Sequence, residues 1–432
     1  MSSLLSFLSF LSVIIIFGCN IKSQSLTQEN SKIKETYHWP VGGERIITGS
    51  FAEFRARNFH MGTDFGTEGK IGVPILALTN GKLLKIQSYR YSIGNAILIK
   101  HDDGFISRYG HMNHFSDRIL KSIKNPSVLR KIKYREDFEL KIKSKDSIKI
   151  SKGEVIGYSG KTGIGPPHLH VELIKDNIYY NVSDHLNLSG HESSIFIDEI
   201  KLVPEDNKTF INGKQKSFVI KTIRGQDGNY YPISSEFIKI QGKVSVQVSS
   251  HEATGRANRL GMKKISLFLN EKELQNFDLT AVYQPDTIRS CFIFDNYVSN
   301  IRGRPFKYYT HSRDDDSINN LLNKQKDTGI IDFKELKKDE NNFIKISVFG
   351  LKYKKSNFVF MVRPDFQKYN FPEIIEPFYN LFKGKELDLI TKDKKFSVKF
   401  FGDSVFSKAY VSVLENKSIN ISTEGIKQVS PI

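Results

Sequence analysis

Cysteine is nearly absent from this chain of 432 residues, which contains only Cys19 and Cys291. If Cys19 carries a lipid, as its context indicates below, no disulfide can form within the mature chain. A secreted protein of this length can fold without disulfides, because its hydrophobic cores are large enough. At roughly 100–200 residues per domain, the length predicts two to four domains.

Acidic residues are scarce relative to basic ones, since 47 Asp and Glu stand against 64 Lys and Arg and give a net charge of +17. A basic surface favours polyanions, a class that includes nucleic acid, anionic lipid and cell-wall polymers. The sequence contains no RNA-binding aromatic signature, zinc-knuckle pattern or helix-turn-helix pattern. Together with the export signal described next, this argues against nucleic acid as a partner.

The N-terminus lacks both charge and a long apolar run. Residues 1–18 carry no charged side chain, and their strongest apolar run covers only residues 13–17. A membrane-spanning helix needs about 20 apolar residues, so this run is too short to cross a bilayer comfortably. It fits the apolar region of a signal peptide, although the usual basic start of such a peptide is missing.

Residues 16–19, Ile-Phe-Gly-Cys, resemble the lipobox of bacterial lipoproteins. In that motif a small residue precedes the cysteine that becomes lipid-modified. We therefore expect a lipoprotein signal peptide at 1–18, lipidation of Cys19 and a membrane anchor that holds the protein in the cell envelope. The alternatives are an uncleaved anchor or a plain signal peptide cut elsewhere.

The remainder of the chain is predicted to be mainly β. A polar tether covers 19–36, and a glycine-punctuated β domain follows at 37–190. A β-rich accessory domain is predicted at 193–365 and a C-terminal β module at 366–432, both of β-sandwich-like character. Strands are expected at 73–78, 82–86, 96–100, 155–158, 243–248, 264–269, 343–349, 357–362, 395–401 and 409–414.

Residues 113–147 differ from the domain around them. They hold about ten Lys and Arg and no glycine, and residues 116–123 have a helix-like pattern. We interpret this stretch as a surface insertion. Its charge fits either a solvated face or a cationic arm that holds an anionic wall polymer near a site.

Histidine is concentrated in the first domain, where six of the 11 His fall between His60 and His170. In residues 60–64, His-Met-Gly-Thr-Asp, the glycine favours a turn into a strand over a shared helix face, and either geometry can bring His60 and Asp64 to one metal. In residues 166–173, alternation predicts a strand on which His168 and His170 face the same way. Here one histidine can bind a metal while the other stands beside it, or both can be surface residues.

A third pattern places His111 after an expected strand, where a lone histidine is more often structural than catalytic. Taken together, His60, Asp64 and His170 form a three-ligand zinc set that leaves a fourth position for water, as catalytic zinc sites do. No His-Glu-x-x-His sequence is present, so no helical glutamate is available as a base. His111 and His168 are then free for proton transfer or for stabilising a tetrahedral intermediate.

These motifs belong to a longer pattern that resembles the lysostaphin/LytM-type zinc endopeptidases of cell walls. The resemblance runs in the family's order from residue 41 to residue 173, about a third of the chain. The matching stretches are 48–55, 58–65, 72–77, 80–82, 94–101, 109–112, 152–157, 159–163 and 168–173.

The resemblance implies a role for each matched position. His60, Asp64 and His170 correspond to the family's ligands for one Zn²⁺ per catalytic domain, and His111 and His168 to its catalytic histidines. His101 matches a recurring position that is not a ligand and is expected to be structural. The implied fold is an antiparallel β-sheet groove of LytM type, with the zinc on its floor.

The resemblance also implies hydrolysis of the peptide cross-links of bacterial peptidoglycan, with stem peptides as substrate, zinc-bound water as nucleophile and histidine as general acid and base. A non-catalytic protein that binds peptidoglycan or regulates a wall amidase is the alternative, since some relatives have lost zinc ligands. A peptidase acting on glycine-rich proteins is a third reading. The C-terminal modules are hypothesised to position the enzyme, to bind an envelope protein partner or to limit access to the groove.

Overall fold

The computed structural model describes residues 37–369 with short gaps, and the backbone of five strands beyond residue 378. The gaps are 56–57, 144–145, 207, 255–257, 300–304, 312–327 and 339. The predicted signal peptide, the tether and Cys19 lie outside the described residues. Within the described part, no helix combines the length and hydrophobicity needed to span a membrane.

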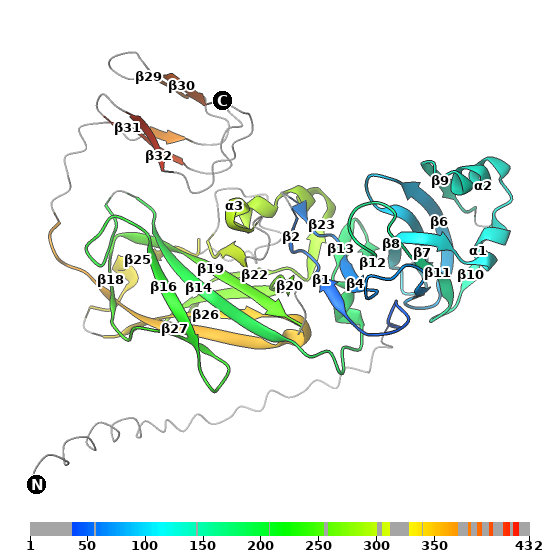
Figure 1. Ribbon diagram of the computed structural model, residues 1–432. Coiled ribbons are helices and arrows are strands. Elements are labelled where there is room, and N and C mark those ends of the chain that lie inside the picture. Colours follow the sequence, from blue (N-terminus) through cyan, green and yellow to red (C-terminus); the bar gives the residue numbers. More distant parts are fainter. Residues whose placement is uncertain are drawn as a thin grey trace, which may run out of the picture. The chain divides into compact units, whose positions relative to one another are not determined.

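The first sheet is antiparallel and is built mainly from the predicted β domain (Figure 1). Its main path, in spatial order, is β1 (Ile47–Gly49), β4 (Thr63–Gly66), β12 (His168–Lys175), β8 (Ile106–Phe115), β7 (Gly94–His101), β6 (Gly81–Tyr89) and β10 (Lys149–Ile150). Five strands attach beside this path: β5 (Pro74–Leu76), β9 (Phe138–Lys141), β11 (Val155–Ser159), β13 (Ile178–Tyr180) and β23 (Ala281–Tyr283). A separate two-stranded hairpin joins β2 (Phe54–Arg55) to β3 (Asn58–Phe59).

Alternation of apolar side chains explains the central strands. Ile97 and Ile99 of β7 are fully buried, and so are Leu169, Val171 and Leu173 of β12. Since successive side chains of a strand point to opposite faces, each set lines one face. All five belong to one hydrophobic core beneath the sheet. That core fixes the register of β12 and therefore the face on which its other side chains emerge.

The basic insertion forms two helices and a strand. Helix α1 (Asp117–Ser122) lies within the stretch predicted to be helical. Helix α2 (Pro126–Lys133) begins with Pro126, and the side chain of Asn125 accepts hydrogen bonds from the amides of Ser127 and Val128. A proline in the first turn and an asparagine cap both favour this start. Strand β9 then pairs with β6, so the insertion extends the edge of the first sheet.

The second sheet follows from residue 194. Its main path runs β20 (Arg259–Leu260), β19 (Lys243–Ala253), β14 (Ser194–Pro204), β16 (Phe218–Arg224), β17 (Tyr230–Pro232), β27 (Lys355–Pro364), β26 (Asn342–Phe349), β21 (Lys264–Leu269) and β22 (Lys272–Asp278). Strands β15 (Phe210–Ile211), β18 (Ile238–Gln241), β24 (Phe306–Tyr309) and β25 (Ile331–Asp332) attach beside it. The short helix α3 (Asn296–Ser299) packs near β24, and 3-10 turns lie at Val182–His185, Gln284–Ile288, Ser290–Phe292, Phe333–Glu335 and Leu351–Tyr353.

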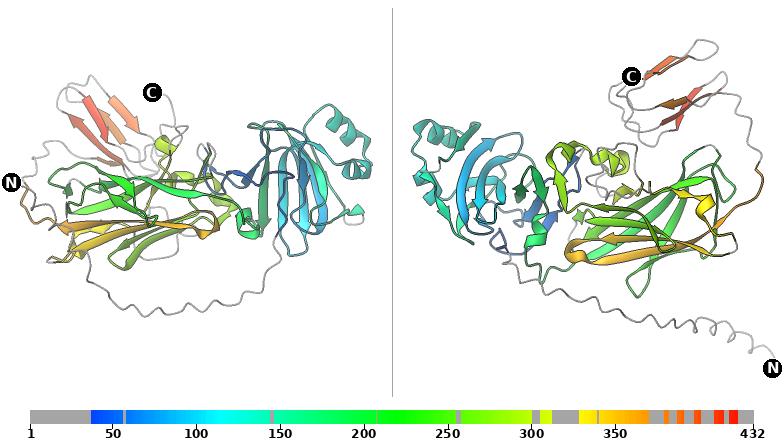
Figure 2. Two further views of the ribbon diagram at one scale, coloured as in Figure 1. Left: turned by 60° about the horizontal axis from the view of Figure 1, so that its bottom comes forward. Right: turned by 180° about the vertical axis from the view of Figure 1, so that it is seen from behind.

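The second sheet folds over itself into a sandwich. Figure 2 shows the green strands β14, β16 and β19 as one layer and the orange strands β26 and β27 as another. Ile200 and Val246 from the first layer share one hydrophobic core with Ile346 and Phe358 from the second. The predicted mainly β fold with a sandwich-like module is thereby confirmed. Of the predicted strands, 264–269 and 409–414 match β21 and β31 (Ala409–Leu414) residue for residue.

The C-terminal strands of the described part form two small sheets. Strand β31 pairs with β28 (Tyr379–Leu381) and β32 (Ser418–Ser422), and β29 (Leu387–Ile390) pairs with β30 (Ser397–Phe400). Every one of these pairs is antiparallel.

The two main sheets are joined by pairing and by packing. Strand β23 belongs to the segment predicted as accessory domain, yet it pairs with β13 of the first sheet. In the other direction, the hairpin β2–β3 precedes the first His-containing motif, yet its Phe54 and Phe59 lie in the core of the second sheet. The domain boundary at 190–193 remains a prediction, and strands and side chains cross it in both directions.

Candidate metal centre and groove

Neighbouring strands bring the first and second histidine motifs together. His60 lies just before β4, and Met61 and Gly62 form the bend that leads into it. Asp64 in β4 stands directly opposite His170 in β12. The predicted turn into a strand and the predicted His-x-His strand are both confirmed.

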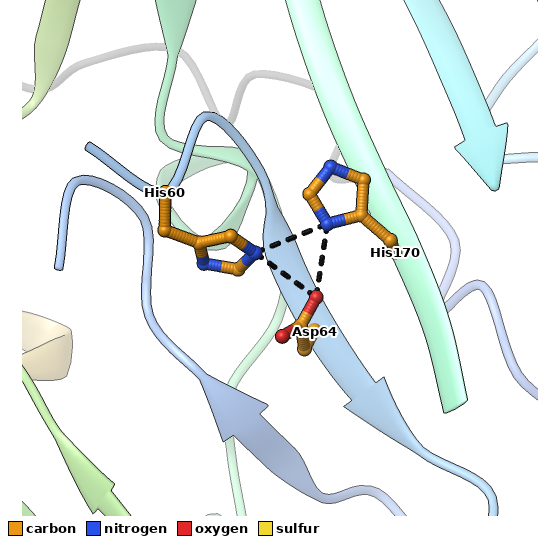
Figure 3. A group of neighbouring side chains, drawn as sticks. All are labelled: His60, Asp64 and His170. Atoms are coloured by element: carbon orange, nitrogen blue, oxygen red, sulfur yellow. Dashed lines mark hydrogen bonds and ion pairs between the residues drawn. The ribbon is translucent and has the colours of Figure 1, made fainter. Parts of the chain in front are cut away.

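The three predicted ligands converge on one point, as Figure 3 shows. His60 Nε2 lies 3.0 Å from His170 Nδ1 and 3.1 Å from Asp64 Oδ1, and His170 Nδ1 lies 2.9 Å from Asp64 Oδ1. All three residues are buried. In a tetrahedral zinc site with bonds of about 2.0 Å, ligand atoms lie about 3.3 Å apart, so the observed triangle is close to the required size.

The outer nitrogen of each ligand histidine has an acceptor of its own. His60 Nδ1 donates to the carbonyl oxygen of Ser50 at 2.7 Å, and His170 Nε2 donates to Glu172 Oε1 at 3.1 Å. A carbonyl or carboxylate oxygen can only accept, so these nitrogens carry the protons and the inner nitrogens keep their lone pairs for a metal. Atoms this close repel one another unless a proton or a metal ion lies among them, so the arrangement is compatible with a bound metal.

The charges of the site agree with this assignment. Burial alone would lower the pKa of His170, but hydrogen bonds to Asp64 and Glu172 raise it to about 9. Burial opposes ionisation of Asp64, yet His60, His168 and His170 hold its pKa well below the usual value. The site therefore favours a positive charge at its centre. A divalent metal would supply that charge and displace the protons.

Two arginines complete the surroundings of the ligands, and sequence reasoning assigned neither a role. Arg108 of β8 forms an ion pair with the buried Glu172, which in turn accepts from His170. Arg55 Nη2 donates to Asp64 Oδ2 at 2.9 Å, which leaves Oδ1 facing the two histidines. The sequence could have identified Glu172, because this residue follows His168 and His170 at a spacing of two and therefore lies on the same face of the strand.

His111 reaches the site through an irregularity in β8. The register between β7 and β8 shifts between Asn95 opposite Met112 and Ile97 opposite Tyr109, and His111 takes a positive φ of 61° there. Such a bulge redirects a side chain. The histidine thus lies within the strand and not after it, and the expectation from the sequence was wrong on this detail.

His111 and His168 stand side by side next to the ligand triangle. Their ring centres are 4.6 Å apart, and the ring of His111 is 5.8 Å from that of His170. His111 Nδ1 donates to the carbonyl of Thr162 at 2.8 Å, and His168 Nδ1 donates to that of Pro166 at 2.7 Å. The Nε2 atoms of both rings are therefore available for proton transfer.

Burial, followed by the neighbouring His168 and His170, lowers the pKa of His111 to about 4. At neutral pH this imidazole is uncharged and can accept a proton. His101 is also buried, but its ring nitrogens bond to the carbonyl of Asn80 and the hydroxyl of Ser107. It does not line the groove described next, which agrees with the structural role expected for it.

The five histidine and aspartate side chains line a groove of about 1010 Å³. The lining includes Ile164, Pro166 and Pro167 from the loop before β12. It also includes side chains from β6 and from the basic insertion, where Lys85 Nζ pairs with Glu139 Oε2 at 3.1 Å. Such an open groove can admit an extended peptide over the proposed metal site.

The absence of a side chain at Gly62 leaves room for the three predicted ligands, His60, Asp64 and His170. A Cβ atom at this position would lie 2.6 Å from His170 Cε1 and Nε2 and 2.6 Å from the carbonyl oxygen of Val171. We expect Gly62→Ala to push the His170 ring out of place and to weaken metal binding by at least about tenfold, as measured by competition with a chromogenic chelator.

Gly42→Ala is the matched control, since its Cβ would meet Pro74 at an ordinary 3.5–3.6 Å. Equal metal affinity in the two alanine variants would show that His170 is not held as described.

Residues 58–129 match the model of peptidase family M23. Residues 37–190, which contain this match, are called the M23 domain below. The matched residues include His60, Asp64 and His111, whereas His168 and His170 follow beyond them on the chain.

Two curated proteins of Vibrio cholerae resemble part of this chain. The peptidoglycan DD-endopeptidase ShyA is 31% identical over 116 residues, which are 27% of this chain and 20% of that protein. The peptidoglycan DD-endopeptidase ShyC is 27% identical over 148 residues, 33% of this chain and 27% of that protein. The similarity thus spans well under half of either relative.

Solved structures give matches over about a third of the chain. A zinc-containing peptidase from Vibrio cholerae is 24% identical, with 34% of this chain and 39% of that chain covered and a TM-score of 0.24. The catalytic domain of the M23 protein EnpA from Enterococcus faecalis is 23% identical, with 33% and 88% covered and a TM-score of 0.23.

Proposed function

We propose that the M23 domain is a zinc-dependent endopeptidase that hydrolyses peptide cross-links of bacterial peptidoglycan. The observation that carries the proposal is the convergence of His60 Nε2, Asp64 Oδ1 and His170 Nδ1 beside two further histidines in one groove. Both curated relatives are named peptidoglycan DD-endopeptidases, which supports this substrate class.

His60, Asp64 and His170 would hold the zinc ion. When bound, zinc polarises a carbonyl group and lowers the pKa of water to about 7. The neutral His111 is placed to accept a proton from the attacking water at Nε2 as the new C–O bond forms. The same nitrogen then donates this proton to the leaving amide nitrogen as the C–N bond breaks, which restores the neutral imidazole.

His168 acts beside His111. Its hydrogen bond to Pro166 fixes the ring, and its Nε2 lies 3.5 Å from Asp64 Oδ1. As an imidazolium, which donates from both ring nitrogens, it can bind the carbonyl oxygen of the scissile amide from there and stabilise the charge that develops during attack. Arg108 and Glu172 hold the third ligand in orientation, so this group of residues is preorganised before a substrate binds.

The cell envelope is the proposed location, in line with the predicted lipid anchor at Cys19. The basic insertion is proposed to approach anionic wall polymers through helix α2, whose last turn carries Arg130, Lys131 and Lys133. The C-terminal modules are proposed to contact an envelope protein or the wall itself.

A panel of peptides tests the substrate. The chain without its first 24 residues would be incubated with a purified cross-linked muropeptide dimer and, separately, with oligoglycine. We expect mass spectrometry to show monomers from the dimer and no cleavage of oligoglycine. Cleavage of oligoglycine with an intact muropeptide dimer would reject peptidoglycan cross-links as the substrate in favour of glycine-rich chains.

A further inference from the structure

We infer that Glu53 is a positioning residue for two of the metal ligands and that the second sheet holds it in place through Gly261. The inference rests on the proposed metal site. The carboxylate of Glu53 bonds to Ser50 and Arg55 and not to a metal ligand, yet the residue is only 5% exposed and both carboxylate oxygens have partners. Those partners lead to His60 on one side and to Asp64 on the other.

The first branch runs through Ser50. Glu53 Oε2 accepts from the Ser50 amide at 2.8 Å and from the Ser50 hydroxyl at 2.7 Å. The carbonyl of the same Ser50 accepts from His60 Nδ1 at 2.7 Å. Backbone hydrogen bonds reinforce this link, since the His60 amide donates to the carbonyl of Glu53 at 2.8 Å. Glu53 therefore fixes Ser50, the residue whose carbonyl orients the imidazole of His60.

The second branch runs through Arg55. Its Nη2 lies 2.7 Å from Glu53 Oε1 and 2.9 Å from Asp64 Oδ2. One guanidinium nitrogen thus bridges the two carboxylates and draws Asp64 Oδ2 away from the ligand triangle. With Oδ2 occupied, Oδ1 is the oxygen left to face His60 and His170. Glu53 and Arg55 therefore make Asp64 a ligand through a single oxygen.

The second sheet provides the anchor for this network. Gly261, the residue after β20, donates its amide proton to Ser50 Oγ at 2.7 Å. The next amide, of Met262, donates to the hydroxyl of the buried Tyr308 at 2.6 Å. A Cβ at position 261 would meet Glu53 Cβ at 3.0 Å and both Ser50 Oγ and Tyr308 Oη at 3.3 Å. Only a glycine fits between these groups without displacing them.

Hydrophobic packing against the second sheet also holds the residues on either side of Glu53. Phe51, Ala52, Phe54 and Phe59 are buried in the core of the second sheet, and the rings of Phe54 and Phe59 lie 5.7 and 6.1 Å from that of Phe294. The segment that carries the first ligand is therefore shaped by the second sheet. We conclude that the second sheet is part of the metal site's supporting structure.

Zinc affinity measured by chelator competition tests the positioning role. Partners of metal ligands typically contribute about 10–100-fold to metal affinity or activity. We expect Glu53→Gln to lower zinc affinity by about that factor, since glutamine keeps the hydrogen bond to Ser50 but loses the charge that holds Arg55. Glu199→Gln is the control, because Glu199 pairs with Lys221 and Lys307 in the second sheet. Unchanged affinity in a folded Glu53→Gln variant would overturn the inference.

A double-substitution cycle separates positioning from general stability. The Arg55 side chain is 46% exposed, so Arg55→Gln should fold even if Glu53→Gln does not. We expect Arg55→Gln to lower zinc affinity by a similar factor, and Glu53→Gln to add little in the Arg55→Gln background. Full additivity of the two losses, or wild-type affinity in Arg55→Gln, would contradict the proposed link to Asp64.

Gly261→Ala tests the anchor in the second sheet. It is expected to weaken zinc binding at least several-fold although residue 261 contacts no ligand, with Gly42→Ala as the matched control. Wild-type affinity in Gly261→Ala would overturn the role of the second sheet. If the wild-type protein itself bound no zinc, the proposed function would fail, whereas a zinc-binding wild type with equally tight variants would reject only this inference.

Discussion

Replacing His170 by alanine is expected to remove both the bound zinc and the hydrolytic activity. The substitution deletes one of three converging ligand atoms and leaves Asp64 and His60 as an incomplete pair. It also leaves the buried Glu172 without the imidazole that it accepts from. Zinc content measured by atomic absorption after gel filtration should fall from one equivalent to near zero, and release of soluble muropeptides should fall to background.

His111→Ala, in contrast to His170→Ala, is expected to lower the activity without removing the zinc. His111 lies next to the ligands but points no atom into their triangle, so zinc should remain bound. Loss of a general acid or base typically slows a reaction by about 10²–10⁴-fold, and we expect a decrease of kcat in that range. The exposed His114, which stacks on Tyr158, provides a control, and His114→Gln should keep both zinc and rate. Tight zinc binding with normal cleavage in His170→Ala would show that the ligand assignment is wrong.

Ending the chain before residue 193 is expected to abolish folding of the M23 domain, and with it zinc binding and activity. Removal of the second sheet would expose Phe51, Phe54 and Phe59, which are now buried in its core. At about 1.5–3 kcal/mol for each aromatic side chain, the loss is roughly 5–9 kcal/mol. A whole domain is stabilised by only about 5–15 kcal/mol, so the isolated first sheet should not remain folded.

The same truncation removes β23, which pairs with β13, and Lys263, which forms an ion pair with Asp184. A chain that ends after residue 369 keeps both main sheets and serves as the control. Solubility, far-UV circular dichroism and zinc content would be compared for the two truncations. A soluble, zinc-loaded and active fragment that ends at residue 192 would refute the structural dependence on the second sheet.

The convergence of three metal-binding side chains could be predicted from the sequence because local patterns determine the geometry around them. Glycine at position 62 predicted the turn into β4 and the alternation of residues 168–173 predicted β12, and these two strands bring His60, Asp64 and His170 together. Strand periodicity also predicted the mainly β fold, because the sequences of β7, β12 and β21 each alternate or concentrate apolar residues. These features depend on neighbours in sequence, and they can be read from it.

Contacts between distant segments could not be predicted in this way. The pairing of β13 with β23 and the burial of Phe54 and Phe59 in the second core join residues more than 90 positions apart. Periodicity shows that a side chain will be buried but does not identify the core that will contain it. The bulge at His111 was missed for a similar reason, because its shifted register depends on pairing with β7.

The residues that contact the predicted ligands could be predicted from the sequence only in part. Glu172 shares a strand face with His168 and His170, so the alternation that predicted the histidines also indicated this carboxylate. Arg108 and Arg55 gave no such signal, because each reaches its carboxylate across strands or across a hairpin. Their assignment needed the three-dimensional structure.

The central claim is tested most directly by the muropeptides that the protein releases from purified peptidoglycan. The chain without its first 24 residues would be stripped with a chelator and assayed before and after one equivalent of zinc is restored, with products identified by mass spectrometry. We predict no release from the metal-free protein and uncross-linked muropeptides once zinc is returned. Intact cross-links in the presence of protein that has bound its equivalent of zinc would contradict the account.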